Sequence, residues 1–93
     1  MSNKRFASVW DALEDSPEEA ENMKLRSALM MALKAQLLRS KLNQAEIAKL
    51  FGVTQPRVSD LLRGKINLFG LDALVNMAVA AGLRVRMSVR KAA

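Results

Sequence analysis

The chain has 93 residues, 51% of them hydrophobic, and a formal net charge of +6 at pH 7. It contains neither cysteine nor histidine, which excludes a disulfide framework, the commonest zinc-binding sets and nucleophiles that depend on histidine. No apolar run approaches the roughly 18–20 residues of a membrane span, and the start of the chain lacks the apolar core of a secretory signal. We therefore expect one small cytoplasmic domain that acts by binding, without a cofactor, a membrane contact or enzymatic activity.

The charge is unevenly distributed along the chain. Residues 1–22 hold two basic and six acidic side chains, whereas residues 23–93 hold thirteen basic and three acidic ones. A basic surface favours binding to a polyanion such as nucleic acid, although it also serves solubility alone. The pattern predicts a basic binding domain preceded by an acidic leader with a separate task.

The leader, residues 1–15, is predicted to be an acidic N-terminal arm. Val9, Trp10 and Leu13 are its apolar anchors and would fit one or two helical turns. We expect Trp10 to dock on the domain or on a dimer partner; the alternative is an arm that engages another protein. Asp15-Ser16-Pro17 marks the boundary with the domain over residues 16–93.

A long helix is predicted from Ser16 to about Lys41. Ser16 can cap it, Pro17 suits the first helical position, and Glu19 completes a capping box. Met30 and Met31 lie beside the main apolar row, so the helix is apolar on more than one side. We interpret them as candidate contacts with a dimer mate or partner; gap-filling core methionine is the alternative. The row itself consists of Leu25, Ala28, Leu29, Ala32, Leu33 and Leu37.

The stretch 43–64 predicts two short helices joined by a tight turn. Asn43 with Glu46 forms a second possible capping box, Gly52 allows the left-handed turn, Thr54 caps the following helix and Gly64 ends it. This order is typical of a helix-turn-helix, whose second helix, here 54–63, can enter the major groove of DNA. The apolar sides of the two helices are Ile47, Ala48, Leu50 and Phe51, then Val58, Leu61 and Leu62.

The rest of the chain predicts a loop, a helix and a strand. A helix over residues 71–81 ends at Gly82, and strict alternation of apolar and polar residues then predicts a strand over 83–90. Its apolar side includes Val85, Met87 and Val89. Because no second strand is predicted, we expect it to pair across a homodimer or with the sheet edge of a partner.

The predicted DNA contacts gather around the second helix of the pair. In this motif the first turn of that helix meets base edges, while flanking groups hold phosphates. Gln55 suits adenine and Arg57 suits guanine. Gln44 would touch phosphate or brace Gln55, and Arg63 would contact phosphate or pair with Asp60. Each residue taken alone is equally consistent with an exposed polar side chain. The complete predicted set is Gln44, Thr54, Gln55, Arg57, Ser59, Asp60, Arg63, Lys65 and Asn67.

These residues carry a family resemblance. The runs 44–48 (QAEIA), 52–59 (GVTQPRVS) and 63–64 (RG) resemble the Cro/C1-type (XRE) helix-turn-helix family. With the flanking elements, residues 17–90 are similar to a subfamily of HigA-like antitoxins and small transcriptional regulators. The resemblance implies a mainly α, lambda repressor-like domain of about five helices, dimers that bind operator palindromes, and DNA contacts near Gln44, Thr54, Gln55, Arg57 and Asp60. The acidic residue at position 60 departs from this expectation. The carboxylate of Asp60 would accept a hydrogen bond from a cytosine amino group or orient Arg57 or Arg63.

Two functions follow as hypotheses. The first is a homodimeric repressor that binds palindromic double-stranded DNA and regulates its own operon. The second is an antitoxin whose main task is to neutralise a cognate toxin protein. The acidic leader and the extra apolar surface of the long helix favour the second, because the resemblance implies that many such toxins are basic RNases.

Overall fold

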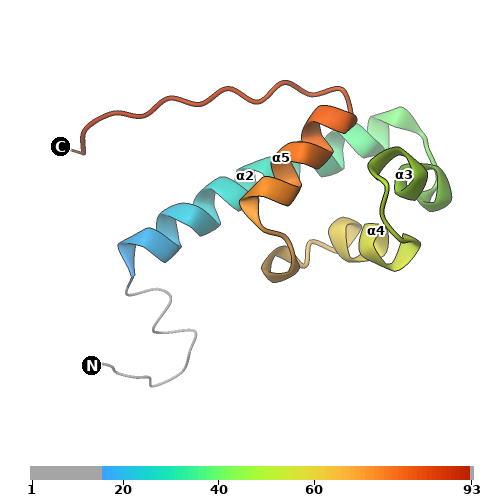
Figure 1. The fold of residues 1–93 in the computed structure, drawn as a ribbon, viewed down its shortest axis with the longest axis horizontal. Coiled ribbons are helices and arrows are strands. Elements are labelled where there is room, and N and C mark those ends of the chain that lie inside the picture. The colour runs from blue at the N-terminus through green and yellow to red at the C-terminus, as the bar shows by residue number, and fades with distance from the viewer. Residues whose placement is uncertain (1–15, 93) are drawn as a thin grey trace, which may run out of the picture.

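The computed structural model describes residues 16–92 of the chain. The long helix α2 runs along the molecule, and the shorter helices gather beside it (Figure 1). The predicted arm over 1–15, including Trp10, lies outside the described residues. Within them, no helix combines the length and the apolar character needed to span a membrane. The elements are α2 (Pro17–Ser40), α3 (Gln44–Phe51), α4 (Gln55–Leu62), the 3-10 helix η1 (Ile66–Leu68) and α5 (Leu71–Ala80).

Helix α2 begins where the sequence predicts. The Ser16 hydroxyl accepts a hydrogen bond from the Glu19 amide at 3.2 Å, and Pro17 occupies the first turn. The Ser16 hydroxyl itself donates to the carboxylate of Glu18 at 3.2 Å. At the far end Lys41 adopts a left-handed conformation, with φ of 62°, which stops the helix before α3.

The caps predicted for the short helices are confirmed. Asn43 and Glu46 form a complete capping box, with the Glu46 amide 2.8 Å from Asn43 Oδ1 and the Asn43 amide 2.9 Å from Glu46 Oε1. Gly52 follows α3 with φ of 68°, and Thr54 caps α4 by accepting from the Arg57 amide at 3.3 Å. These local bonds satisfy backbone donors that a helix start otherwise leaves unpaired, so the turn geometry is specified within the stretch itself.

Replacing Gly52 by alanine is expected to lower the free energy of unfolding by about 1–2 kcal/mol, because a Cβ disfavours the left-handed conformation. The cost should be purely conformational, since a Cβ at this position would meet no heavy atom within 4 Å. Asparagine at Gly52 should cost less, because its side chain tolerates this region. Urea unfolding measures both, and Gly70→Ser, at an ordinary φ of −76°, serves as control. Equal stability of Gly52→Ala and the wild type would contradict the assignment.

The core lies between α2 and the shorter helices. It includes Met30, Leu33 and Leu37 of α2, which are 4%, 0% and 3% exposed. The interpretation of Met30 as a partner contact is therefore wrong: its side chain fills the core, as gap-filling methionines do. Met31 remains 71% exposed. The other buried members are Ile47, Ala48, Val58, Leu61, Phe69, Leu74 and Met77.

The predicted apolar row of α2 is only partly a core row. The buried positions Met30, Leu33 and Leu37 are spaced by three and four residues, as one helix face requires. Leu25 is 45% exposed, and it lines an open groove together with Ala28 and Ala32, whereas Leu29 lines the groove and also packs against the core. Exposed alanines lie next to the buried face of this helix. Because alanine counts as apolar, the predicted row is wider than the buried face.

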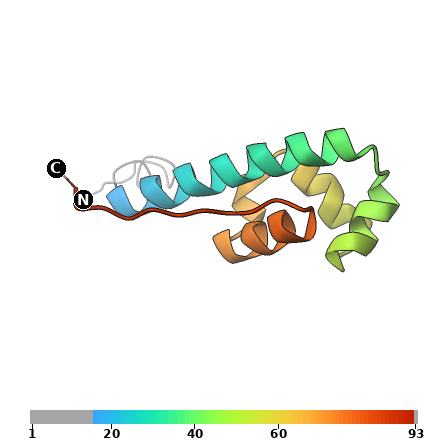
Figure 2. The same cartoon turned by 90° about the horizontal axis from the view of Figure 1, so that it is seen from above.

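The structure also differs from the prediction for the C-terminal residues. Residues 83–92 run back along α2 toward its N-terminal end as an extended chain (Figure 1, Figure 2). The strand predicted over 83–90 is not formed in the single chain, because a strand requires ladder hydrogen bonds to a neighbour. The predicted five helices are also not found: residues 16–92 contain four α-helices and one 3-10 helix.

Candidate nucleic-acid interface

Helix α4 is held so that its first turn faces outward. Val58 and Leu61, 1% and 0% exposed, anchor one side of the helix in the core. Pro56 lies in the first turn, where a helix amide has no internal partner. Thr54 and Gln55, at the start of the helix, are exposed. The positive end of the helix dipole therefore lies at the surface with them.

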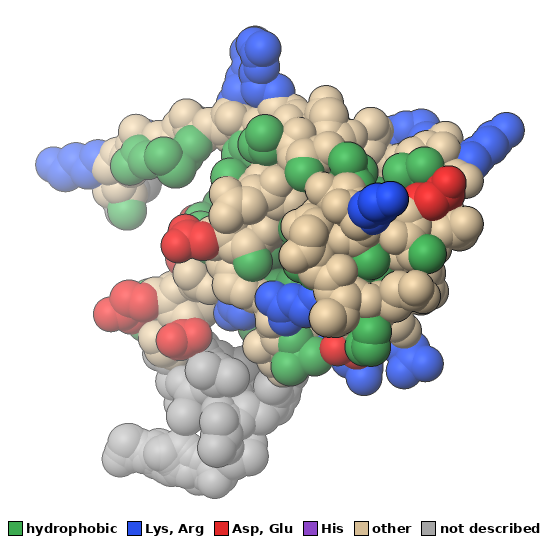
Figure 3. Space-filling model, turned by 45° about the vertical axis from the view of Figure 1, so that its right-hand side comes forward, with side chains coloured by type: hydrophobic (Ala, Val, Ile, Leu, Met, Phe, Trp, Pro, Cys, Tyr) green, Lys and Arg blue, Asp and Glu red, His purple; other side chains and the backbone are tan. Residues whose placement is uncertain are grey.

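The predicted contact residues fall into two groups by burial. Arg57, Ser59 and Asp60 are partly buried. Figure 3 shows Lys and Arg side chains scattered over one face of the molecule, with a few acidic side chains among them. The exposed members are Gln44, Thr54, Gln55, Arg63, Lys65 and Asn67. The described hydrogen bonds include none between Gln44 and Gln55, so the predicted bracing of Gln55 is not found.

Arg57 folds back onto its own chain. Its Nη1 donates to the Leu68 carbonyl at 2.7 Å. Its guanidinium carbon lies 4.1 Å from the centroid of the Phe69 ring, a cation–π arrangement over a side chain that is 0% exposed. In the free chain Arg57 therefore braces α4 against η1, and the predicted contact of Arg57 with guanine stays a prediction.

A second arginine, which the sequence analysis missed, holds the same loop. Arg26 of α2 reaches the carbonyls of Ile66 and Phe69 through Nη1, at 3.4 and 3.5 Å. Its Nε is buried without a protein partner. The signal for this role was present: Arg26 lies four residues before Met30, on the row that faces the core. A charged side chain in such a position needs internal acceptors.

Asp60 has a different partner from the predicted ones. Its carboxylate lies 3.4 Å from Lys65 Nζ, with the two side chains 30% and 49% exposed. The prediction that Asp60 orients Arg57 or pairs with Arg63 is therefore not supported. The pair joins the last turns of α4 to the start of η1, and it neutralises part of the positive charge that Lys65 brings to this edge.

The groups on this surface are suited to binding. In residues 16–92 no group of three or more histidine, cysteine, aspartate or glutamate side chains is placed to hold a metal ion. What the surface offers is an outward helix start, amide and hydroxyl side chains, and a loop of fixed shape beside them. These groups suit hydrogen bonding to base edges and phosphates.

Comparison with known proteins agrees with this geometry. A family model described as a helix-turn-helix domain matches residues 12–90. A solved structure described as an XRE family transcriptional regulator is 32% identical in sequence and superposes with a TM-score of 0.73. The match covers 80% of this chain and 83% of that one. Comparison with curated proteins gave no match.

Proposed function

The chain belongs to the helix-turn-helix domain family and to the XRE group of transcriptional regulators, and we propose that it is a repressor that binds operator DNA as a homodimer. The observation that carries this proposal is the outward start of α4, where Thr54 and Gln55 are exposed at the positive end of the helix dipole. On this proposal the protein acts by binding alone, in the cytoplasm, without a cofactor or a catalytic step.

In the proposed complex α4 lies in the major groove. Gln55, in its first turn, forms two hydrogen bonds with an adenine edge. Thr54, Lys65 and Asn67 contact phosphates. Gln44 extends these contacts from the start of α3, whereas Ser59 and Arg63 lie farther along α4. Arg57 acts indirectly, because it fixes the loop that presents Lys65 and Asn67.

A homodimer would read a palindrome. Two copies related by a two-fold axis present two α4 helices, and the half-sites of such an operator lie about 34 Å apart, one turn of B-DNA. An operator within the gene's own promoter would make the repressor autoregulatory. Like-charged basic surfaces on both copies would add to the attraction for DNA without specifying its sequence.

Selection of bound sequences from random DNA is the experiment that tests this proposal. The wild type should enrich a palindrome with two half-sites. Gln55→Ala should lose discrimination at one base pair of each half-site by about tenfold, equivalent to about 1.4 kcal/mol. Asn67→Ala is the matched control and should weaken binding to all sequences alike. Enrichment of no sequence by the wild type would refute specific binding.

Removing the carboxylate of Asp60 is expected to strengthen DNA binding. Asp60→Asn frees Lys65 from its 3.4 Å ion pair and removes a charge that repels phosphate. The loss of folding stability should be small, about 0.2–1 kcal/mol, because the pair is partly exposed. Fluorescence anisotropy across a salt series should show tighter binding to every sequence. The slope of log affinity against log salt concentration should be steeper by about one released counterion.

The control for this prediction is Asp72→Asn, which makes the same change in net charge in the first turn of α5. It should leave affinity nearly unchanged. An equal gain from both variants would show that total charge, rather than the release of Lys65, determines the effect.

A second candidate function is that of an antitoxin of the HigA-like kind. The observation in its favour is the exposure of Met31 and Leu38 on α2, 71% and 75%, since such apolar side chains favour a protein partner. A small basic reading frame beside the gene would support it. Co-expression with that product should yield a complex that Met31→Lys disrupts while DNA binding persists; a stable homodimer without any such neighbour would count against it.

A further inference from the structure

The short helix η1 depends on side chains of other elements for its shape. Its own backbone contributes the bond from the Leu68 amide to the Lys65 carbonyl and the bond from the Phe69 amide to the Ile66 carbonyl, each at 3.1 Å. A single 3-10 turn has poorer hydrogen-bond geometry than an α-helix. Donors from outside η1 therefore matter, and two arginines supply them to the carbonyls of residues 66, 68 and 69.

The two arginines connect η1 to two different helices. Arg57 belongs to α4 and donates to the Leu68 carbonyl at 2.7 Å. Arg26 belongs to α2 and reaches the carbonyls of Ile66 and Phe69. Helix α2 contributes three buried side chains to the core. The contacts of Arg26 therefore fix η1 relative to the core of the domain, whereas those of Arg57 fix it relative to α4.

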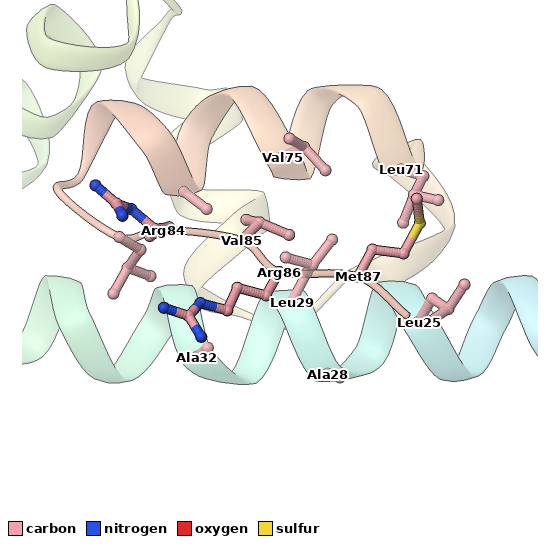
Figure 4. A pocket seen from close by; sticks show the side chains of 12 residues that line it. Leu25, Ala28, Leu29, Ala32, Leu71, Val75, Arg84, Val85, Arg86 and Met87 are labelled. Atoms are coloured by element: carbon pink, nitrogen blue, oxygen red, sulfur yellow. The ribbon is translucent and has the colours of Figure 1, made fainter. Parts of the chain in front are cut away.

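Arg26 lies on a different side of α2 from the open groove. Figure 4 shows Leu25, Ala28 and Leu29 of α2 along that groove, beside the C-terminal segment. Arg26 follows Leu25 by one residue, which is a rotation of about 100° about the helix axis, and its side chain reaches η1. A substitution at Arg26 therefore changes the contact with η1 and leaves the lining of the groove as it is.

The surroundings of Arg26 indicate that the guanidinium contributes little net stability. Its Nη1 lies 3.4 and 3.5 Å from its two acceptors, which is long for an N–H···O bond. Its Nε is buried without a partner among residues 16–92, and burying an unpaired N–H costs free energy. An apolar side chain of similar size in place of a buried charge is often neutral or stabilising. The guanidinium still places a positive charge against two carbonyls of the loop and so favours one orientation of η1.

We propose that Arg26 is a positioning residue for DNA binding, which holds η1 so that Lys65 and Asn67 reach phosphates. Both of these side chains are exposed on the loop that Arg26 contacts. Since α4 and η1 must meet the same duplex at once, their relative position determines whether the phosphate contacts form. This inference rests on the proposed function, and it gives a share of the affinity to α2, which makes none of the proposed DNA contacts.

Arg26→Met tests this role, because methionine keeps an unbranched apolar stem and removes the guanidinium. Affinity for duplex DNA should fall by on the order of tenfold at about 0.1 M salt, and the slope of log affinity against log salt concentration should become shallower by about one released counterion. The midpoint of urea unfolding should change little. A large fall in that midpoint would make Arg26 a stabilising residue and overturn the proposal.

The matched control is Lys24→Met, which removes the same charge from an exposed position of α2. It should leave DNA affinity within about twofold of the wild type, because salt screens an exposed charge that lies away from the duplex. Equal losses of affinity from Lys24→Met and Arg26→Met would show that net charge alone determines the effect, which contradicts the positioning role.

A double-mutant cycle tests whether Arg26 acts through the loop. In a chain that carries Lys65→Ala and Asn67→Ala, the phosphate contacts of η1 are absent, so Arg26→Met should cause no further loss of affinity. Combined with Gln44→Ala, at the start of α3, the two fold-changes should multiply, because the free-energy effects of independent sites add. Fold-changes that multiply in both backgrounds would overturn the proposal.

Amide hydrogen exchange measures the loop in the free chain. Arg26→Met should speed the exchange of the Leu68 and Phe69 amides by on the order of tenfold, while the Leu61 amide of α4 keeps its rate. Faster exchange with unchanged DNA affinity would give Arg26 a structural role alone. Arg26→Lys keeps the charge without the planar guanidinium and should regain only part of the affinity. Full affinity in Arg26→Lys would contradict the need for the guanidinium geometry.

The outcomes separate this inference from the proposed function. Phosphate contacts carry no sequence information, so the effect of Arg26→Met can be measured on any duplex. If the wild type selects no sequence but Arg26→Met weakens its binding to every duplex, the inference stands and the repressor proposal fails. If the wild type selects a palindrome and Arg26→Met binds it equally well, the repressor proposal stands and the inference fails.

Discussion

Phe69→Ala is expected to lower the free energy of unfolding by about 3–5 kcal/mol, the usual cost of truncating a buried phenylalanine. Phe69 is 0% exposed and follows η1, so its ring joins the loop to the core formed by α2, α4 and α5. A domain of this size is stable by only about 5–15 kcal/mol. The variant should therefore unfold at much lower urea concentration, or fail to fold at 37 °C.

The neighbouring residue provides the control for Phe69. Leu68 belongs to η1 and is 49% exposed, so Leu68→Ala should cost less than about 1 kcal/mol. Phe69→Leu should fall between the two, because it retains much of the buried apolar volume. Similar losses for Phe69→Ala and Leu68→Ala would show that the ring does not support the loop.

Arg57→Ala is expected to cost about 2–4 kcal/mol in the free energy of unfolding. A cation–π contact contributes about 0.5–2 kcal/mol, and a charged hydrogen bond about 1.5–3 kcal/mol. DNA affinity should fall for all sequences alike, since the loop carrying Lys65 and Asn67 loses its support. Urea unfolding and binding to selected and scrambled DNA measure the two effects.

The base-reading interpretation of Arg57 predicts a different result. Stability would then be unchanged, and discrimination would relax at one base pair. Arg57→Lys separates charge from shape, because lysine keeps the charge but lacks the planar guanidinium that fits both the ring and the carbonyl. If lysine restores full stability, the brace is electrostatic and the stacking on Phe69 contributes little.

The helix-turn-helix could be predicted because its determinants are local. Asn43, Glu46 and Thr54 bond to amides within three residues of themselves. Gly52 supplies a left-handed turn that few other residues tolerate. Each signal is complete within a short window, and the fold at those positions follows from it.

The acceptors of Arg26 and the roles of Arg57 and Met30 could not be predicted in this way. Arg26 and its acceptors at positions 66 and 69 are separated by about forty residues, and no local pattern links them. The sequence pattern of α4 alone places Arg57 on its solvent-exposed side, and only the packing of η1 beside this helix gives Arg57 its partners. Met30 differs from Met31 only by a rotation about the helix axis, and its burial depends on where α4 and α5 pack.

The C-terminal strand illustrates a further limit. Alternation marks residues 83–90 as an extended segment, and in the single chain these residues form neither a helix nor a strand. A ladder needs a second strand, and the period of one sequence carries no information about which chain supplies it. The prediction therefore identified the segment but not its hydrogen bonds.

The attachment of Arg57 to Leu68 and Phe69 restricts how the proposed DNA preference can be retargeted. A library that randomises the exposed side of α4 must keep Arg57 constant, since most replacements there would damage the scaffold before any new preference appeared. Gln55, Ser59 and Arg63 are the positions left for exchange. Paralogues that diverge in target would thus be expected to vary at these three positions, while the arginine that holds the loop stays the same.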